Sequence, residues 1–323
     1  MTQQTSFRHE LLLYTNGDQG LLDGVLAPLR SALQAEAAVL VAVTRERAAA
    51  IRQALGSDAD DIRFMDVQGQ ARNPARSFVA WQDFAREHAA RSDGDALGIS
   101  EPVWPGRSAA ELSECRRQEA LLNLAFDAGP AWRLLCCYDL DGLPERVIDA
   151  ARQTHPLLAG TAASTPNEHF GCATEAPQPF AGSLPEPGCE FEVLQFSGDS
   201  LGQVRHSLGT WAESQGLDGD GAEELVLAVN EIAANSIRHG GGSGTMRRWR
   251  ENGTLLCEVR DTGHIRAPLT GRVRPPAEAI SGRGVWLANQ LCDLVQIRSA
   301  PTGSVVRVHK HLPVNGRAQS DGE

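Results

Sequence analysis

Hydrophobic and polar positions in the first half of the chain alternate between short apolar runs and longer amphipathic stretches. The apolar runs are typical of buried strands and occupy residues 9–16, 37–44, 62–65, 97–99 and 132–138. Helical spacing fills residues 18–33, 45–55, 78–90, 109–126 and 143–154. The last helix is expected to end at His155, because the following proline disfavours helix before it. This alternation predicts an α/β layer with a mostly parallel sheet.

The second half begins near Cys189 and has a different order of elements. It predicts a strand over residues 189–196, helices over 200–215 and 223–239, and two strands over 244–251 and 254–261 joined by an Asn-Gly turn. A helix over 285–292 and a hairpin over 293–312 follow. Alternation on strand 244–251 would expose Arg248 and Arg250, which indicates a solvated edge strand. This order favours an α+β domain.

Residues 160–188 separate the two halves and are rich in proline, glycine, serine, alanine and threonine. Such a composition is typical of an extended linker. We therefore expect domains at 8–160 and 189–312, a linker at 161–188 and a flexible tail at 313–323.

Composition narrows the class of protein. The chain has 323 residues, 41% hydrophobic and 22% charged, with a formal net charge of -11. Direct binding to nucleic acid or to an anionic membrane surface is disfavoured by that charge. There is no apolar run of ~18 residues and no signal-peptide layout, and the seven cysteines have no metal-like spacing. A reduced cytoplasmic protein is expected, with a redox role for the Cys136-Cys137 pair left as an alternative.

The candidate chemistry begins on the helix over residues 223–239. Leu225, Val229 and Ile232 share its apolar stripe, and Glu231 and Asn235 lie four residues apart at the edge of that stripe. A carboxylate can accept a proton, and an amide oxygen is a hard neutral ligand for Mg²⁺. The alternative is an ordinary amphipathic helix with polar residues on its solvated side.

Three further motifs follow in order. The strand over residues 254–261 ends in Asp261, with Gly263 two positions later. Gly282 and Gly284 open a helix, and Gly303-Ser304 lies in the final hairpin. Together with Glu231 and Asn235, this order resembles the Bergerat-fold (GHKL) ATPases: DNA gyrase, mismatch-repair ATPases, histidine kinases and anti-sigma-factor serine kinases. The compact spacing is most similar to the anti-sigma serine kinases.

The resemblance implies a Bergerat-type α+β sandwich that binds ATP and Mg²⁺. Asp261 would then accept from the adenine amino group, Gly263 would let the base approach the backbone, and Ser304 would bind on the adenine side. One departure from the family pattern is Ile265, where a second glycine is common. An Asp at a strand end and a serine in a hairpin turn are the alternatives for Asp261 and Ser304.

The phosphate side of the implied site rests on the second glycine pair. Gly282 and Gly284 allow backbone conformations closed to other residues, and helix N-terminal amides can hold phosphates. Arg283 would reach the terminal phosphate, or is an exposed loop arginine. By the same resemblance Asn235 holds Mg²⁺, and Glu231 is the catalytic base.

The first half resembles the MEDS sensory domain, a RecA-like α/β module, and contains no P-loop motif. The resemblance rests on the segments at residues 101–123, 134–144 and 151–156. Five charged residues gather around Trp104: Glu101, Arg107, Glu111, Glu114 and Glu119. They are interpreted as structural ion pairs and a solvated helix face in preference to an effector pocket. The spacing of Glu119 and Asn123 mimics an N box and is interpreted as chance.

These resemblances imply a bacterial signalling regulator in which a sensory domain controls an ATP-dependent serine/threonine kinase. The implied partners are a STAS-type anti-anti-sigma protein and a sigma factor, with a small-molecule effector at the first domain. Two alternatives stay open: an atypical histidine kinase and a non-catalytic, ATP-dependent binding switch. A histidine kinase would need a helical hairpin with a phosphorylatable histidine where the proline-rich segment lies. The oligomeric state is open, a homodimer being one option.

Overall fold

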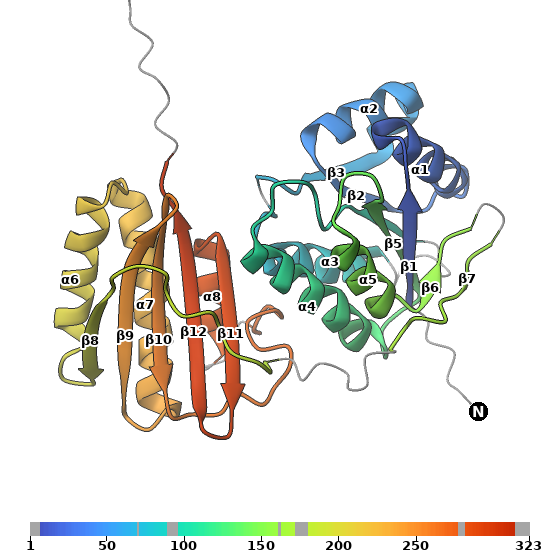
Figure 1. Ribbon diagram of the computed structural model, residues 1–323. Helices are drawn as coiled ribbons and strands as arrows, with labels where there is room; N and C mark the ends of the chain where they lie inside the picture. The colour runs from blue at the N-terminus through green and yellow to red at the C-terminus, as the bar shows by residue number, and fades with distance from the viewer. Residues whose placement is uncertain are drawn as a thin grey trace, which may run out of the picture. The chain divides into compact units, whose positions relative to one another are not determined.

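The computed structural model describes residues 7–69, 71–88, 96–160, 163–171, 180–276 and 282–313. The chain divides into two compact units, Met1–Pro179 and Phe180–Glu323, which are described separately (Figure 1). Within the described ranges, no helix combines the length and the apolar character needed to cross a bilayer.

The N-terminal unit is built on a seven-stranded sheet with the order β3-β2-β4-β5-β1-β6-β7. Every neighbouring pair is parallel except β6 and β7. The strands are β1 (Phe7–Tyr14), β2 (Val39–Val43), β3 (Ile62–Asp66), β4 (Leu97–Ser100), β5 (Trp132–Asp139), β6 (Leu157–Leu158) and β7 (Thr165–Pro166). The predicted mostly parallel α/β fold is confirmed.

Helices connect these parallel strands and pack on the sheet. They are α1 (Gly17–Gln34), α2 (Arg45–Leu55), the 3₁₀ helix η1 (Gly56–Asp61), α3 (Pro74–His88), α4 (Ala109–Phe126) and α5 (Glu145–Thr154). All residues of β2 are buried, as expected for a strand covered on both faces. The start of α4 is set by a capping box, in which Ser108 and Glu111 exchange side-chain-to-backbone hydrogen bonds.

The C-terminal unit is an antiparallel five-stranded sheet with the order β11-β12-β10-β9-β8, covered on one face by three helices (Figure 1). Its strands are β8 (Glu192–Ser197), β9 (Ser243–Glu251), β10 (Thr254–Asp261), β11 (Leu294–Ala300) and β12 (Gly303–His311). The helices are α6 (Leu201–Ser214), α7 (Gly219–His239) and α8 (Arg283–Leu291). The α+β sandwich predicted for this half is confirmed.

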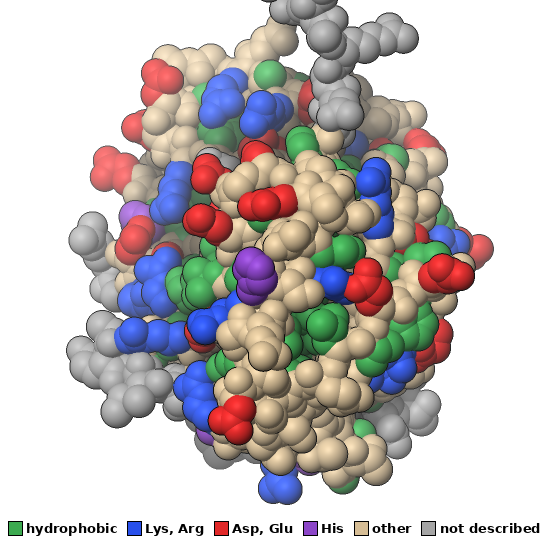
Figure 2. All heavy atoms as spheres, turned by 90° about the vertical axis from the view of Figure 1, so that its left-hand side faces the viewer, with side chains coloured by type: hydrophobic (Ala, Val, Ile, Leu, Met, Phe, Trp, Pro, Cys, Tyr) green, Lys and Arg blue, Asp and Glu red, His purple; other side chains and the backbone are tan. Residues whose placement is uncertain are grey.

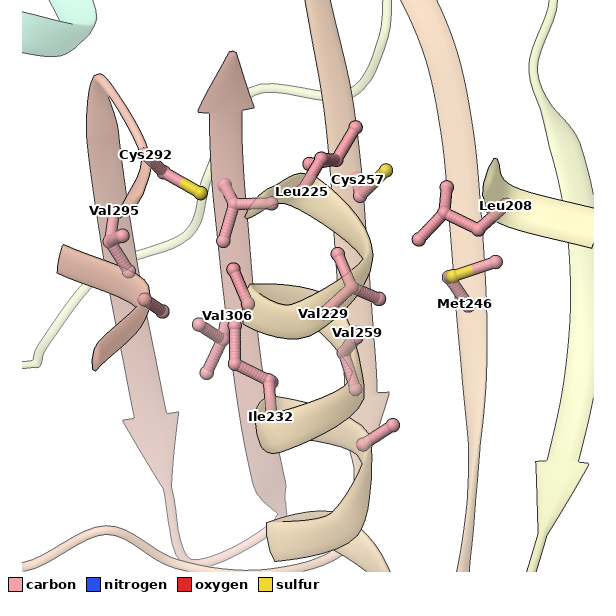
Figure 3. Close-up of a cluster of buried hydrophobic side chains, with 14 of the residues drawn as sticks. Leu208, Leu225, Val229, Ile232, Met246, Cys257, Val259, Cys292, Val295 and Val306 are labelled. Atoms are coloured by element: carbon pink, nitrogen blue, oxygen red, sulfur yellow. The ribbon is translucent and has the colours of Figure 1, made fainter. Parts of the chain in front are cut away.

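Helix α7 forms the centre of this second core. Leu225, Val229 and Ile232 on its apolar stripe face Val259 and Val306 of the sheet (Figure 3). At the start of the helix, the Asp218 carboxylate accepts from the backbone N–H of Gly221 at 2.8 Å. The stripe fixes the rotation of α7, so that Asn235 and Ser236 come to the end of β10.

The structure differs from the prediction at strand β9, which was expected at the edge of the sheet and is not an edge strand. Strand β8 pairs along its outer side, and Arg248 is buried, with its guanidinium donating to Glu192 and to the Ser207 carbonyl. The expectation of an exposed Arg248 was wrong, because β8 and α6 cover the position. Figure 2 views the side on which α6 lies, where acidic and basic side chains are interspersed with apolar ones.

The expected linker at 161–188 is partly folded onto the two units. Thr165–Pro166 forms β7, Phe180 packs in the C-terminal core, and the Pro185 carbonyl accepts from Arg307. Residues 161–162 and 172–179 lie outside the described residues, as does the expected tail from residue 314 onward.

Candidate functional site

A cavity of about 210 Å³ opens in the C-terminal unit between α7, the end of β10, the start of β12 and the first turn of α8. Of the residues singled out from the sequence, five line it: Asn235, Asp261, Gly263, Gly282 and Ser304. Apolar walls come from residues such as Ile232, Ile265, Val285 and Val306. An apolar cavity with a few convergent polar groups is typical of a small-molecule site.

Asp261 is the best-fixed polar group in the cavity. One carboxylate oxygen (Oδ2) accepts from the Ser236 hydroxyl at 2.5 Å, and the other (Oδ1) accepts from the Gly263 backbone N–H at 2.7 Å. The side chain is half-buried, so its remaining acceptor positions are open to a ligand.

Two glycines surround this carboxylate closely enough that a side chain would not fit. A Cβ atom at Gly240 would lie 2.5 Å from the Asp261 Cγ atom. A Cβ atom at Gly263 would lie 2.9 Å from the Gly240 Cα atom and from the His239 carbonyl oxygen. The absence of side chains at Gly240 and Gly263 therefore lets the helix end and the loop after β10 approach closely, with the Asp261 carboxylate between them at the cavity wall.

Ser304 stands directly opposite Asp261 in the β10–β12 register. Its hydroxyl donates to the Gly263 carbonyl at 2.7 Å and lies 3.1 Å from the Ser299 hydroxyl. Ile265, the departure from the family pattern, donates its backbone N–H to the Ser299 hydroxyl at 2.8 Å and lines the cavity. Hydroxyl bonds thus hold the loop after Asp261 against β11 and β12, without the second glycine.

Glu231 and Asn235 are brought together at Gly284. A Cβ atom at Gly284 would lie 2.7 Å from the Asn235 Nδ2 atom and 3.1 Å from a Glu231 carboxylate oxygen. Both side chains are half-buried; Asn235 lines the cavity, and Glu231 lies one helical turn away, outside its lining. The sequence spacing therefore predicted their proximity.

Gly282 and Arg283 mark the start of α8. Gly282 is the N-cap residue with φ +89°, a left-handed conformation that favours glycine. No side chain caps α8 among the described residues, and uncapped N–H groups at the start of a helix can bind an anion. Arg283 is exposed outside the cavity lining, and its guanidinium donates to the Pro276 carbonyl at 3.4 Å.

Sequence reasoning missed two residues of this site, Ser236 and Gly240. Ser236 lies on the buried stripe of α7, and its hydroxyl donates to Asp261. The available signal was a hydroxyl on a buried stripe, which needs a hydrogen-bond partner. Gly240 follows the last residue of α7, where the sequence alone indicates only a helix end, and the structure places Asp261 against it.

Two known families match separate parts of the chain. Residues 8–156 match the MEDS family, described as the methanogen/methylotroph, DcmR sensory domain. Residues 195–310 match the family of the histidine kinase-like ATPase domain. The chain joins a MEDS domain to a histidine kinase-like ATPase domain. The combination is that of a signalling protein.

Two solved structures are similar to part of the chain. One contains the RsbU and RsbW domains of Rv1364c from Mycobacterium tuberculosis, with 17% identity over 38% of this chain and 32% of that chain, at a TM-score of 0.29. Another is the Acinetobacter baumannii histidine kinase AdeS, with 9% identity over 39% of this chain and 70% of that chain, at a TM-score of 0.23. The chain spans about a third of the length of the first. No curated protein matches the chain.

In the MEDS domain, Glu101, Arg107, Glu111 and Glu114 form structural ion pairs, as interpreted from the sequence. The expectation of a solvated helix face was wrong, because the glutamates of α4 pack inward and none of them is more than 3% exposed. The Arg107 guanidinium lies over the Trp104 ring at 3.6 Å, and Glu111 binds Arg72 at 2.8 Å. Burial raises the pKa of Glu111, but hydrogen bonds from Ser108 and the charge of Arg72 outweigh it and hold that pKa below its ordinary value. These groups stabilise the start of α4.

A separate cavity of about 320 Å³ lies in the MEDS domain between α4 and α5. Leu112, Arg116, Tyr138, Arg146 and Val147 are among its lining residues. It combines apolar walls with two guanidinium groups, a surface that suits a small polar or anionic molecule.

Proposed function

We propose that the chain is an ATP-dependent protein serine/threonine kinase of the anti-sigma type, with Mg²⁺ as its metal, controlled by its MEDS domain. The observation that carries this proposal is the placement of Asp261 in the cavity, with Asn235 and Glu231 at Gly284 nearby. The carboxylate suits an adenine amino group, and the amide and second carboxylate suit metal-phosphate chemistry.

The adenine side of the proposed site would be held by Asp261, Gly263 and Ser304. Asp261 accepts from the exocyclic amino group, since both its oxygens have unused acceptor capacity. Gly263 presents backbone without a side chain, and a Cβ atom there would already crowd Gly240. Ser304 acts by positioning the Gly263 carbonyl through its 2.7 Å hydrogen bond.

The phosphate side would be held by Asn235, Gly282, Gly284 and the first turn of α8. Mg·ATP, when bound, supplies the phosphoryl group and part of the charge that neutralises it. Asn235 provides an amide oxygen for the metal, and α8 provides N-terminal N–H groups. Arg283 reaches the terminal phosphate only after releasing the Pro276 carbonyl. Glu231 takes the proton of the acceptor hydroxyl as general base.

By resemblance the acceptor is a serine or threonine of a STAS-type anti-anti-sigma protein, and the second partner is a sigma factor, which makes the chain a regulator of transcription in the cytoplasm. The cavity between α4 and α5 supports a small-molecule effector at the MEDS domain. Effector binding there would change how the ATPase domain meets its partners.

Phosphate transfer from labelled ATP to candidate STAS proteins tests this proposal. Transfer to serine or threonine leaves an acid-stable phosphoester, which is the expected product. An acid-labile phosphoramidate would instead indicate a histidine kinase. Tight ATP binding with no transfer to any partner would overturn the kinase and favour a nucleotide-dependent binding switch.

One observation weighs against the histidine kinase. His155, the histidine just before the proline-rich segment, has no exposed surface, and its Nδ1 atom donates to the Ala151 carbonyl at 2.7 Å. A phosphoacceptor must reach the γ-phosphate, which a buried and hydrogen-bonded imidazole does not.

A further inference from the structure

Four buried side chains in the MEDS domain bring two imidazoles, a carboxylate and a thiol together. His9 lies on β1, Glu119 on α4, Cys136 on β5 and His155 directly after α5. One nitrogen, oxygen or sulfur atom from each lies within 4.8 Å of all the others. None of the four is more than 3% exposed. The four residues are far apart in the sequence, and only the fold brings their side chains together.

The hydrogen-bond network fixes which nitrogen of each imidazole faces inward. The Asn123 amide nitrogen donates to the Thr154 carbonyl at 2.7 Å, so its Oδ1 atom is the acceptor 3.0 Å from the Nδ1 atom of His9. The Nδ1 atom of His155 lies 2.7 Å from the Ala151 carbonyl, which can only accept. Both Nδ1 atoms therefore carry hydrogen, an assignment that follows from the partners.

In a neutral imidazole the other nitrogen is then an acceptor, and in both rings it faces Glu119. The Nε2 atoms of His9 and His155 lie 3.2 Å and 3.0 Å from the same Glu119 carboxylate oxygen. With both imidazoles neutral, two nitrogen lone pairs and a carboxylate oxygen converge on one point. Among the four side chains only the Cys136 thiol, 3.4 Å from the His9 Nε2 atom, can donate to these three acceptors, an arrangement that burial makes costly.

Other buried carboxylates in the described part of the chain have an arginine partner. These are Glu10, Glu101, Glu111, Glu114, Asp139 and Glu258. Glu119 has none among the described residues; its ion-pair partners are the two histidines. A cation at the point where the four side chains converge would balance the charge of Glu119.

We propose that His9, Glu119, Cys136 and His155 bind one Zn²⁺ ion. Nitrogen, oxygen and sulfur donors in a set of four are typical of tetrahedral zinc. Such an ion spaces its ligand atoms by about 3.3–3.6 Å, and three of the spacings here are 3.0, 3.2 and 3.4 Å. Closing the site needs only small side-chain movements.

The charges of the proposed site balance. The Cys136 thiol loses its proton to solvent on binding, and the ion then carries one carboxylate, one thiolate and two neutral imidazoles. The sum is zero, which limits the cost of burying the ion. Burial, together with the Glu119 carboxylate, raises the pKa of the Cys136 thiol well above its usual value, and a bound Zn²⁺ would lower it.

Four protein ligands leave no open position, so the ion is structural rather than catalytic. It would join α4 and α5 to the centre of the sheet. The Tyr138 ring packs edge-on against the His155 ring at 5.8 Å and also lines the cavity between those two helices. The ion would therefore set the shape of the effector cavity, whichever reaction the ATPase domain performs.

The test uses the full chain with Cys189, an exposed thiol, replaced by Ser. After chelation, Zn²⁺ and Co²⁺ are titrated in turn, and bound metal is measured by atomic spectroscopy. One equivalent of zinc per chain is expected, together with a thiolate-to-cobalt charge-transfer band. Because changing a second-shell partner already costs about 10–100-fold in affinity, Cys136→Ser should weaken cobalt binding at least about a hundredfold.

The neighbouring Cys137 provides a matched control. It is also fully buried, but it packs into the hydrophobic cluster on the other face of β5. Cys137→Ser should keep the metal and the charge-transfer band. The proposal is overturned if the Cys189→Ser chain binds well under one equivalent, if its cobalt complex lacks the thiolate band, or if Cys136→Ser folds and keeps full affinity. The first two measurements need no Cys136 variant, so they hold even if that variant does not fold.

Discussion

Glu119 in the MEDS domain and Glu258 in the ATPase domain are both buried carboxylates, but different groups neutralise them. Arg307 binds one Glu258 oxygen through two nitrogens at 2.6 and 2.9 Å, and Arg260 binds the other at 2.6 Å. Glu119 faces two imidazoles and a thiol, none of which carries a permanent charge. Guanidinium groups stay charged at any physiological pH, so the negative charge of Glu258 is always neutralised. The charge of Glu119 is neutralised only when an imidazole takes up a proton or an ion binds.

Glu231 adds a third environment. It is half-buried next to Asn235, and no described arginine or lysine forms an ion pair with it. A carboxylate that is neither paired with an arginine nor fully buried can exchange protons with a ligand. The three environments fit a structural role for Glu258 and the roles proposed above for Glu119, at a metal ion, and for Glu231, as a base.

The largest expected effect is on Glu231. Glu231→Gln keeps size and much of the hydrogen bonding but removes the proton acceptor, so phosphate transfer should fall by ~10²–10⁴. Affinity for Mg·ATP should hardly change, whereas Asn235→Ala should weaken metal and nucleotide together. Transfer rate and nucleotide affinity are measured for both variants. Wild-type turnover by Glu231→Gln would show that this carboxylate is not the base.

The elements that the sequence predicted best have strong local signals. The helix at Ala109–Phe126 and the strand at Thr254–Asp261 have the predicted bounds. The structure shows a capping box at the start of the first, and the Asn-Gly turn identified in the sequence precedes the second. Strand pairing leaves no such signal. The burial of Arg248 depends on β8 lying alongside β9, which local sequence does not determine.

The nucleotide site and the zinc site likewise differ in how far local sequence predicts them. Asn235, Asp261 and Gly263 belong to ordered motifs, so the sequence predicted residues that the structure places around one cavity; their roles remain proposals. The cluster of His9, Glu119, Cys136 and His155 was not predicted, because only the sheet order β5-β1-β6 and the packing of α4 bring it together. The Glu119 and Asn123 spacing, interpreted as chance, places both side chains against His9.

Removal of the Glu258 carboxylate, which two arginines neutralise, should have the next largest effect, on stability. Glu258→Gln leaves Arg307 buried without its counter-charge, and breaking one side of a buried pair typically costs about 3–5 kcal/mol. The free energy of unfolding of the ATPase domain, measured in urea, should fall by that amount with or without chelator. Glu186→Gln is the control, because this exposed residue binds Arg247 and Arg260 at the surface and should change stability little. Equal losses of stability in Glu258→Gln and Glu186→Gln would contradict the view that the buried pair of Glu258 and Arg307 matters more than a surface pair.

A smaller effect is expected at Asp261. Asp261→Asn replaces an acceptor with a donor beside the proposed adenine amino group and leaves an unmatched polar pair, which costs about 1–3 kcal/mol. Calorimetry should show ATP binding weakened by about 5–150-fold, with the unfolding of the MEDS domain unchanged. Unchanged ATP affinity in a folded variant would remove Asp261 from the adenine site.

The smallest expected effect comes from Ser236, which acts on the ligand through Asp261. Its hydroxyl donates to the Asp261 carboxylate at 2.5 Å from a buried position. Ser236→Ala removes one hydrogen bond, so ATP affinity should fall by about 2–10-fold, corresponding to about 0.5–1.5 kcal/mol. Ser214→Ala is the control, because that hydroxyl is exposed and its hydrogen bonds, to the Trp211 carbonyl and from the Gln215 amide, lie at the end of α6. If Ser236 orients Asp261, the double variant with Asp261→Asn should lose less affinity than the two single losses combined. Strictly additive losses would instead mean that Ser236 and Asp261 act on the nucleotide independently.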